Sequence, residues 1–449
     1  MVMAQITSVA IFLLMFILLA TDRIPRHHAA LGCGLLTMLV VFGLCLKDPG
    51  SAWYILNLES IFSPGFWYRT ADAQASVGIN WETILFLSCM MIMVDGMALS
   101  GFFRWLCLSI AHAVRFKPLP IFLLFMLLSA GLSMFIDSIT VIMFLAAVTI
   151  ELALLLQLNP VPMLLAEIFC ANLGGSATMC GDPPNIIIGT ALHYSFFDFV
   201  SNTGLIALFS LLLTIPYFYL MFRGAFSPPE DTEGVSFPSP SQAIVNRGTF
   251  LCSCVIFSLA VVLLVTHEQT GLTISSIGVV LAFLTLLTHR NHASQLLKNL
   301  DYKTLLFFIG LFLTVGSLEH TGILRILATG IQTLSGGQSH IMVFMILWGS
   351  GVASAFIDNI PFAATMIPVI RTLAESQGID LQTLAWALSI GTDIGGSATP
   401  IGASANVVGI SIAAKSGYSI SWKRYCKVQV PVTLLVLSLS TLIIFLRYL

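Results

Sequence analysis

A polar stretch in the middle of apolar sequence constrains this chain more than any other feature. Residues 172–185 read Asn-Leu-Gly-Gly-Ser-Ala-Thr-Met-Cys-Gly-Asp-Pro-Pro-Asn, and their glycines and prolines oppose an uninterrupted helix. A second such stretch, residues 393–406, reads Asp-Ile-Gly-Gly-Ser-Ala-Thr-Pro-Ile-Gly-Ala-Ser-Ala-Asn. Inside a membrane, broken backbone is tolerated only where it is buried in protein or lines a wet cavity. Two helix breaks in corresponding halves therefore predict a transport site.

The composition places these breaks in a membrane. Of the 449 residues, 57% are hydrophobic and only 9% are charged, whereas a soluble domain has about 25% charged residues. Apolar runs long enough to cross a bilayer recur from Ile6 to the C-terminus. The first run lacks a basic n-region and a small-residue cleavage pattern, so we expect a retained helix and not a signal peptide. We expect an all-α polytopic protein of the plasma membrane, which in a bacterium is the inner membrane.

The order of apolar and polar segments predicts about ten crossings and two re-entrant hairpins. The first hairpin has apolar arms at 118–136 and 141–156, and the second has its tip at 358–361. Acids at both tips would be costly facing lipid, so the tips are expected to lie in a protein cavity. We divide the chain into a first half (1–222), a hydrophilic cytoplasmic linker (223–247) and a second half (248–449).

The two halves are copies of each other. They align at a constant shift of 221 residues (358 − 137, 395 − 174 and 406 − 185), from Thr83/Thr304 to Asn185/Asn406. Independent coincidence over such a length is not credible, so we infer a duplication. In the predicted topology an odd number of crossings separates the paired helices, which makes the second copy inverted. The bias of Lys and Arg toward one side agrees with this topology. The four polar motifs would then converge near the midplane.

The polar motifs predict a binding site for a cation and an anionic solute. Broken helices expose carbonyl oxygens at one end, which can ligate Na⁺, and N–H groups at the other, which can hold an anion. Few basic residues lie near the acids in the sequence, so these acids are candidate cation ligands or proton carriers. Na⁺ is expected at Asp137, Ser138, Asp358 and Asn359. The full set of expected cation- and substrate-binding residues is Asp137, Ser138, Thr140, Asn172, Gly174, Gly175, Ser176, Thr178, Asp182, Asn185, Asp358, Asn359, Asp393, Gly395, Gly396, Ser397, Thr399 and Asn406.

Some of these residues have structural alternatives. Asp182 precedes Pro-Pro and could be the N-cap of the following helix. The Gly-Gly pairs could only permit close helix packing, and Asn172 and Asn185 could only bridge freed backbone groups. Glu167, inside an apolar run, could be an interhelical partner. For the acids at the hairpin tips a purely structural role is harder to sustain, because burying a carboxylate is expensive.

At these residues the chain resembles the ion transporter superfamily, in the branch of arsenite permeases, sodium/proton antiporters and the pigmentation P protein. The motifs that carry the resemblance are residues 133–137 with Thr140, 174–185 (GGSATMCGDPPN) and 356–366 (FIDNIPFAATM) followed by GGSAT. The resemblance implies a citrate transporter-like homodimer with a scaffold domain and a mobile transport domain, which work by an elevator-like movement. Ser138 and Cys180 depart from the family pattern, which usually has Asn and a larger aliphatic residue there. Residues 403–405 are Ala-Ser-Ala in place of Asp-Pro-Pro.

We therefore expect a secondary active transporter of a small inorganic or organic anion or an oxyanion-like solute, such as arsenite or a dicarboxylate. Its coupling ion would be Na⁺ or H⁺. A Na⁺/H⁺ antiporter is the main alternative, and a passive anion channel is a weaker one. The sequence has no nucleophile–base set, metal-ligand spacing or basic stripe, so no enzyme activity, cofactor or nucleic-acid partner is expected.

Overall fold

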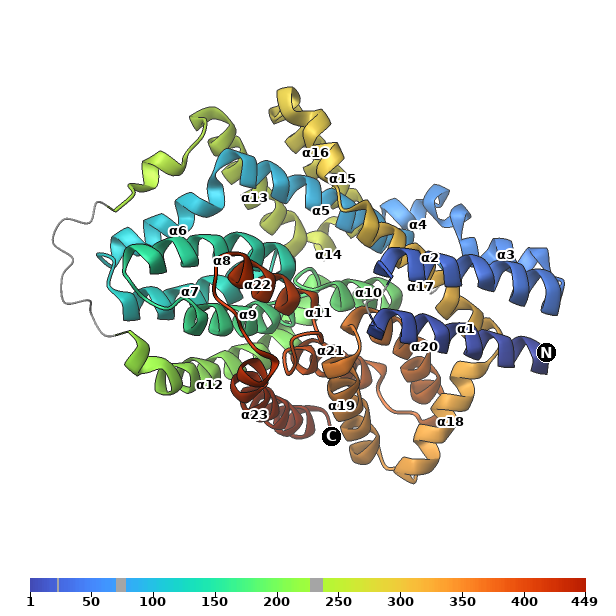
Figure 1. Ribbon diagram of the computed structural model, residues 1–449. Coiled ribbons are helices and arrows are strands. Elements are labelled where there is room, and N and C mark those ends of the chain that lie inside the picture. The colour runs from blue at the N-terminus through green and yellow to red at the C-terminus, as the bar shows by residue number, and fades with distance from the viewer. Residues whose placement is uncertain (22–23, 70–77, 227–236) are drawn as a thin grey trace.

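The computed structural model describes residues 1–21, 24–69, 78–226 and 237–449, and these residues are almost entirely helical (Figure 1). In this part of the chain, nine helices are long and apolar enough to cross a membrane. A tenth candidate span is bent by 95° between Ile274–Thr288 and Arg290–Asn299. The prediction of an all-helical polytopic protein is thus confirmed, and the re-entrant depth of the hairpins stays a prediction. Residues 227–236 of the predicted linker lie outside the described residues.

The first part of the chain contains the following elements in order. They are α1 (Val2–Thr21), α2 (Arg26–Leu36), η1 (Thr37–Leu46), α3 (Pro49–Leu56), η2 (Leu58–Phe62), α4 (Pro64–Trp67), α5 (Trp81–Ser100), α6 (Phe102–Ala113), α7 (Pro118–Ser133), α8 (Ser138–Leu155), α9 (Val161–Gly175), α10 (Pro183–Leu192), α11 (Phe196–Phe199), η3 (Val200–Gly204) and α12 (Leu205–Phe222). Helix α5 ends at Gly101, which has φ = +86°, and α6 begins directly after it.

The second part repeats this order. It comprises η4 (Arg223–Ala225), η5 (Pro240–Ala243), α13 (Arg247–Val265), α14 (His267–Thr270), α15 (Ile274–Thr288), η6 (Arg290–His292), α16 (Ala293–Asn299), α17 (Tyr302–His320), α18 (Ile323–Ser335), α19 (Ser339–Phe356), α20 (Asn359–Gln377), α21 (Leu381–Gly396), α22 (Ser404–Lys415) and α23 (Trp422–Tyr448). Helices α17, α18, α19, α20 and α22 each start 221 residues after α5, α6, α7, α8 and α10 (for example 302 − 81). The duplication seen in the sequence therefore extends to the helix boundaries. The opposite membrane orientation of the two copies stays a prediction.

The helices sort into two packed groups (Figure 1). The frame group comprises α1, α2 with η1, α5, α13, α15 and α17, in which α2 packs along α17 and α15 packs along α5. The core group comprises α7–α10, α12 and α19–α23, in which α7 packs on α9, α19 on α21, α8 on α22 and α10 on α20. Helices α6 and α18 follow the frame helices α5 and α17 and pack against the core helices α8 and α20.

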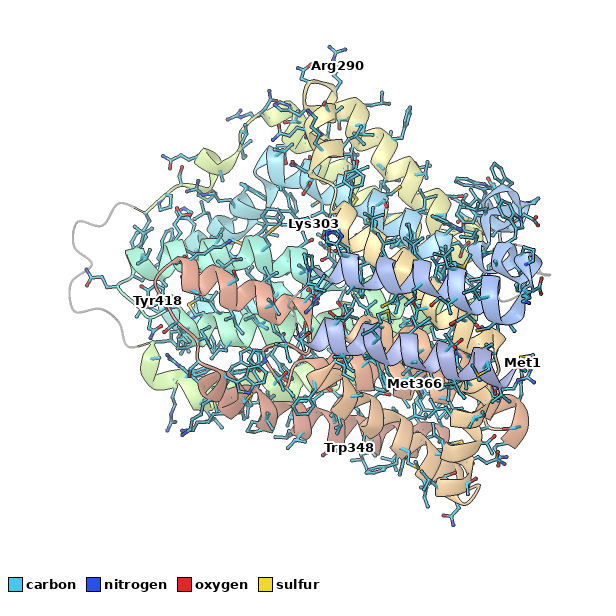
Figure 2. The ribbon with its side chains drawn as sticks, turned by 45° about the vertical axis from the view of Figure 1, so that its right-hand side comes forward. Met1, Arg290, Lys303, Trp348, Met366 and Tyr418 are labelled. Atoms are coloured by element: carbon cyan, nitrogen blue, oxygen red, sulfur yellow. The ribbon has the colours of Figure 1, made fainter. Side chains whose placement is uncertain are left out.

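The interior of both groups of helices is apolar. The bend between α15 and α16 lies at the periphery of the molecule. In Figure 2 the side chain of Arg290 marks the bend after α15 at the edge of the molecule. Met366 of α20 is buried, as are most side chains of α9 and α21. The polar groups of a helix that is buried on all sides must find their hydrogen-bond partners within the protein. The broken helices α9 and α21 lie in such surroundings.

Glycines allow the closest helix approaches, as small residues commonly do between membrane helices. A Cβ at Gly174 of α9 would lie 2.1 Å from the carbonyl oxygen of Ala130 in α7, and one at Gly395 of α21 would lie 2.3 Å from Gly351 Cα in α19. In the frame group, a Cβ at Gly310 of α17 would lie 2.3 Å from the Ala30 carbonyl carbon of α2. The packing alternative thus accounts for one glycine of each Gly-Gly pair.

We predict that Gly174→Ala lowers the apparent melting temperature of the detergent-solubilised protein. The methyl group would push α7 away from α9, and overpacking of this kind costs about 1–3 kcal/mol. Gly131→Ala is the matched control on α7, because a Cβ there meets nothing within 4 Å. The control should be neutral or slightly stabilising, since alanine favours a helix over glycine. Equal melting temperatures for the two variants would contradict the backbone contact.

Candidate functional site

Both helices break where the sequence predicted. Helix α9 ends at Gly175 and α10 begins at Pro183, while α21 ends at Gly396 and α22 begins at Ser404. The residues of the first break, 176–182, are all buried. The two hairpin turns, at Asp137 between α7 and α8 and at Asp358 between α19 and α20, lie beside these breaks.

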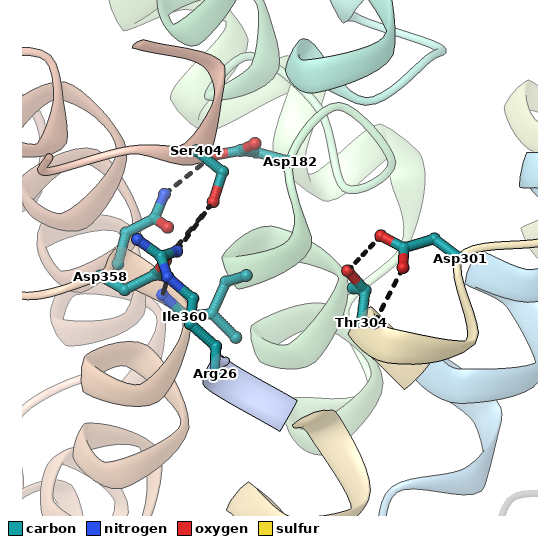
Figure 3. Close-up of polar contacts among 8 residues, drawn as sticks. Arg26, Asp182, Asp301, Thr304, Asp358, Ile360 and Ser404 are labelled. Atoms are coloured by element: carbon teal, nitrogen blue, oxygen red, sulfur yellow. Dashed lines mark hydrogen bonds and ion pairs between the residues drawn. The ribbon is translucent and has the colours of Figure 1, made fainter. Parts of the chain in front are cut away.

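Asp182 joins the two hairpin tips. Its Oδ1 accepts a hydrogen bond of 2.8 Å from Ser138 Oγ. Its Oδ2 accepts one of 3.0 Å from Asn359 Nδ2, which is the dashed line at Asp182 in Figure 3. The side chain is only 4% exposed. Asp182 holds the N-cap position of α10, yet its carboxylate caps no backbone N–H of that helix. The capping alternative therefore does not describe this side chain, and Ser138 supplies a donor at the tip even though it replaces the usual asparagine.

Asn185 and Asn406 hold the broken backbone in shape. Asn185 Nδ2 donates to the carbonyl oxygens of Gly175 and Thr178, both at 3.1 Å. Asn406, its counterpart in the second copy, donates to those of Gly396 and Thr399, both at 2.8 Å. Carbonyls left over when a helix ends need such partners where water is scarce. The bridging alternative is therefore correct for Asn185, and the same role applies to Asn406.

Asn172 and Asp393 occupy equivalent positions, 221 residues apart, but differ in chemistry. Asn172 Nδ2 donates to Ser397 Oγ at 3.0 Å and to Asn406 Oδ1 at 2.9 Å, which ties the first copy to the second. Asp393 is fully buried, and neither of its carboxyl oxygens has a hydrogen-bond partner among the described residues. Its nearest polar neighbours are Asp182 and Asn185.

Two buried carboxyl groups side by side make this the most demanding point of the structure. Asp182 and Asp393 come from different copies and interact electrostatically. Buried carboxylates need a positive or hydrogen-bonding partner. A proton or a bound cation would offset the negative charge of this pair.

The acids at the hairpin tips both cap helices, a role that the sequence analysis did not consider for them. Asp137 caps α8 and accepts from Thr140 N at 2.9 Å and from Thr140 Oγ1 at 2.6 Å. Asp358 caps α20 and accepts from Ile360 N at 3.1 Å. A purely structural reading of these two acids therefore has more support than the sequence suggested.

Asp358 also has a cationic partner, although few basic residues lie near it in the sequence. Arg26 Nη1, at the start of α2, lies 2.5 Å from Asp358 Oδ2, and it also donates to Ser404 Oγ at 3.3 Å (Figure 3). The two partners are 332 residues apart in the chain. Neighbourhood in the sequence therefore could not reveal the pair.

The remaining predicted residues shape the breaks. Thr178 Oγ1 donates to Met134 O at 2.5 Å, Thr399 Oγ1 donates to Ala355 O, and Ser176 Oγ donates to Leu173 O. A Cβ at Gly175 or Gly396 would lie 3.0 or 2.9 Å from the carbonyl oxygen of Gly181 or Gly402. These contacts keep each loop tight and fasten it to the first arm of its own hairpin.

Three residues of this network were not predicted as site residues. Arg26 opens α2 in a short basic segment with His27 and His28, and its sequence position gives no sign of the distant acid that it contacts. Ser389 donates to Asn185 Oδ1 at 2.6 Å, and Ser404 contacts Asp358 at 3.4 Å. No local signal distinguishes Ser389 from other small residues in apolar helices, so only the packing reveals it.

A cavity of about 500 Å³ lies between the frame and core groups, away from the acids. Its lining includes Asn80 and Glu82 of the frame side and Met179 and Thr190 of the core side. His267, the first residue of α14, also lines it, and burial lowers the pKa of that imidazole. The described lining contains neither Asp182 nor Asp393, so this cavity is separate from the acid pair.

Comparisons with known proteins agree on one family. The model of the citrate transporter family CitMHS matches residues 16–391. The "46 kDa membrane protein" of Mycobacterium leprae is 33% identical over 449 residues, which cover 99% of both chains. The P protein of Mus musculus is 28% identical over 80% of this chain and 52% of its own length. Among solved structures, the YdaH transporter of Alcanivorax borkumensis has a similar fold, with a TM-score of 0.56 at 14% identity, over 88% of this chain and 97% of that one.

We predict that Asn406→Ala destabilises the protein more than an ordinary polar truncation. It would leave the carbonyls of Gly396 and Thr399 and the amide of Asn172 short of a partner, at about 1–3 kcal/mol for each unsatisfied buried group. The measurement is the apparent melting temperature in detergent, with exposed Asn299→Ala at the end of α16 as the control. If the two variants melted together, Asn406 would not be holding the break.

Proposed function

The chain belongs to the citrate transporter family CitMHS, and from this premise we propose that it moves a small anion or oxyanion-like solute, of arsenite or dicarboxylate type, coupled to Na⁺ or H⁺. Membership confirms the resemblance inferred from the sequence and makes the chain a multi-pass secondary transporter and not an enzyme. The identity of the solute and the coupling ion, residence in the plasma membrane and assembly as a homodimer are parts of the proposal.

The single observation that carries the coupling is the acid pair Asp182–Asp393. The pair is buried, draws one acid from each copy, and is linked through Ser138 and Asn359 to both hairpin tips. A site that needs one positive charge to be stable is a site that can bind and release Na⁺ or H⁺ during a cycle. We assign the role of coupling site to these acids, together with Asp137 and Asp358 at the tips.

The anionic nature of the solute is supported by the helix ends at the breaks. Helices α10 (Pro183–Leu192) and α22 (Ser404–Lys415) both begin at the site, so their N-terminal ends direct positive partial charge toward it. The carbonyl oxygens that face a cation come instead from the ends of α9 and α21. A cation and an anion bound at opposite half-helix ends would stabilise each other.

The two packed groups support an elevator-like cycle. All the proposed site residues of the breaks and tips belong to the core group, and the frame group contributes Arg26 from outside. Helices α6 and α18 connect the groups and could accommodate their displacement. Movement of the core group past the frame group would expose the same site alternately to the two sides.

The alternative is a Na⁺/H⁺ antiporter, in which the acids exchange the two cations and no other solute moves. The same acid pair favours it, because a pair that holds one proton or one Na⁺ at a time would exchange them directly. A passive anion channel has less support, since a channel needs no compensated buried acids.

We predict uphill accumulation of a small anion in proteoliposomes when a Na⁺ or proton gradient is imposed. A panel of oxyanions and di- and tricarboxylates would be tested with each gradient separately. Proton movement driven by a Na⁺ gradient, in the absence of any anion, would favour the antiporter. Flux that only equilibrates the anion would favour the channel.

We predict that Asp393→Asn, Asp137→Asn and Asp358→Asn abolish gradient-driven transport while the protein stays folded. Each removes a carboxylate that the coupling cation needs, and asparagine remains a good N-cap at the two tips. Asp301→Asn is the matched control, because Asp301 caps α17 through Thr304 N and Oγ1 just as Asp137 caps α8 through Thr140. Normal coupled transport by all three site variants would refute the assigned roles.

A further inference from the structure

The two hairpin tips are not equivalent in charge. At the first tip, Asp137 accepts hydrogen bonds from the N–H and the hydroxyl of Thr140. At the second, Arg26 places a full positive charge 2.5 Å from Asp358 Oδ2, while Oδ1 accepts from Ile360 N. The Arg26 side chain is 32% exposed and that of Asp358 is 7% exposed. One tip thus has its positive charge supplied by the protein itself, at a place that an ion can reach from outside.

The ion pair crosses the boundary between the two groups of helices. Arg26 opens α2, which is held to α17 by the backbone approach at Gly310 and Ala30 and therefore belongs rigidly to the frame group. Asp358 is held in the core group as the N-cap of α20, and Asn359 beside it bonds to Asp182. Arg26 also donates to Ser404 at the start of α22, so it contacts the core group twice. Sliding of the core group along the frame group must break both contacts.

We propose that Arg26 is a tethered competitor of the coupling cation: its guanidinium occupies Asp358 in the empty carrier and is displaced when the cation binds there. This inference rests on the proposed function, because it requires Asp358 to be a ligand of the coupling cation. Asp358 would then carry a positive partner in every state, and its charge would never be buried uncompensated. The same exchange of partners releases the core group from the frame group, so that the cation-loaded carrier moves and the empty carrier is retained.

Ionisable groups lie near the pair on both sides of the boundary. Among the described residues they include Asp182, which is linked to the tip through Asn359, and His27, His28, Asp301 and Lys303 at the starts of α2 and α17. These groups lie on both sides of the boundary between the frame and core groups. In a proton-coupled carrier, the pH dependence of transport would therefore reflect the pair and its neighbours together. The test therefore measures Na⁺ dependence at one fixed pH and pH dependence without Na⁺ as separate arms.

The experiment is transport in proteoliposomes by wild type, Arg26→Gln, Arg26→Lys and Arg104→Gln. Removal of the competitor should lower the half-saturating Na⁺ concentration about fivefold, or raise the pH of half-maximal transport by about 0.7 unit if the ion is H⁺. Solute leak without any cation gradient should increase. Arg26→Lys should shift the half-saturating Na⁺ concentration, or the pH of half-maximal transport, in the same direction by a smaller amount. The reason is that an ammonium group is a weaker partner than the guanidinium at this contact. If Arg26→Gln does not fold, the shift measured with Arg26→Lys decides whether Arg26 competes with the cation.

Arg104→Gln is the matched control, because it breaks the other ion pair of the described residues, Arg104–Glu151, between α6 and the core group. Its half-saturation should equal that of wild type. If wild type depends on the cation but the Arg26 variants match it or need more cation, the competition is refuted and the proposed function stands. If wild-type transport depends on neither Na⁺ nor pH, the proposed function fails and the inference fails with it.

Discussion

The structure depends on satisfying the backbone groups that two broken helices leave free inside an apolar protein. An ordinary membrane helix pairs its own N–H and C=O groups, but α9 and α21 end in the interior, where water cannot replace the lost partners. Asn185 and Asn406 solve this problem in the same way, each with one amide group on two carbonyl oxygens. The glycines let the loops lie close to their own hairpins, and Thr178 and Thr399 fasten them there. The polar site is therefore first of all a solution to a backbone problem.

The charges are distributed differently from the backbone supports. The asparagine clamps, the threonine ties and the acids at the hairpin tips obey the 221-residue repeat, whereas the two acids of the central pair do not. Asp182 corresponds to Ala403, and Asp393 corresponds to Asn172. Each copy thus contributes one acid from a different position, and the two meet in the middle as a single pair. Under the proposed function, a duplicated scaffold with unduplicated charges would form one coupling site instead of two independent ones.

Arg26 lies outside the segments that align at the 221-residue shift, and its charge makes Asp358 different from its counterpart Asp137. Asp137 and Asp358 are equivalent in sequence and both cap a helix, yet among the described residues only Asp358 forms an ion pair with an arginine of the frame group. The pair also indicates where the core group lies relative to the frame group in this structure, because the tip of the second hairpin stands at the first turn of α2. A buried or half-buried ion pair is weak evidence for stability by itself. Its position across the boundary between the two helix groups is the basis for the proposed role in their movement.

Much of this protein followed from the sequence alone, because membrane burial makes each broken or charged segment costly. The apolar runs gave the helices, glycine and proline located both breaks, and the constant shift exposed the duplication. The helix stop at Gly101, the bend at Arg290 and the pairings of Asp182, Asn172 and Arg26 came only from the tertiary structure. Those features depend on partners tens to hundreds of residues away, and no local pattern records which distant side chain will face a buried acid. The sequence determined that acids and bare peptide groups must meet inside the membrane protein, and the packing decided which of them meet and which one an arginine neutralises.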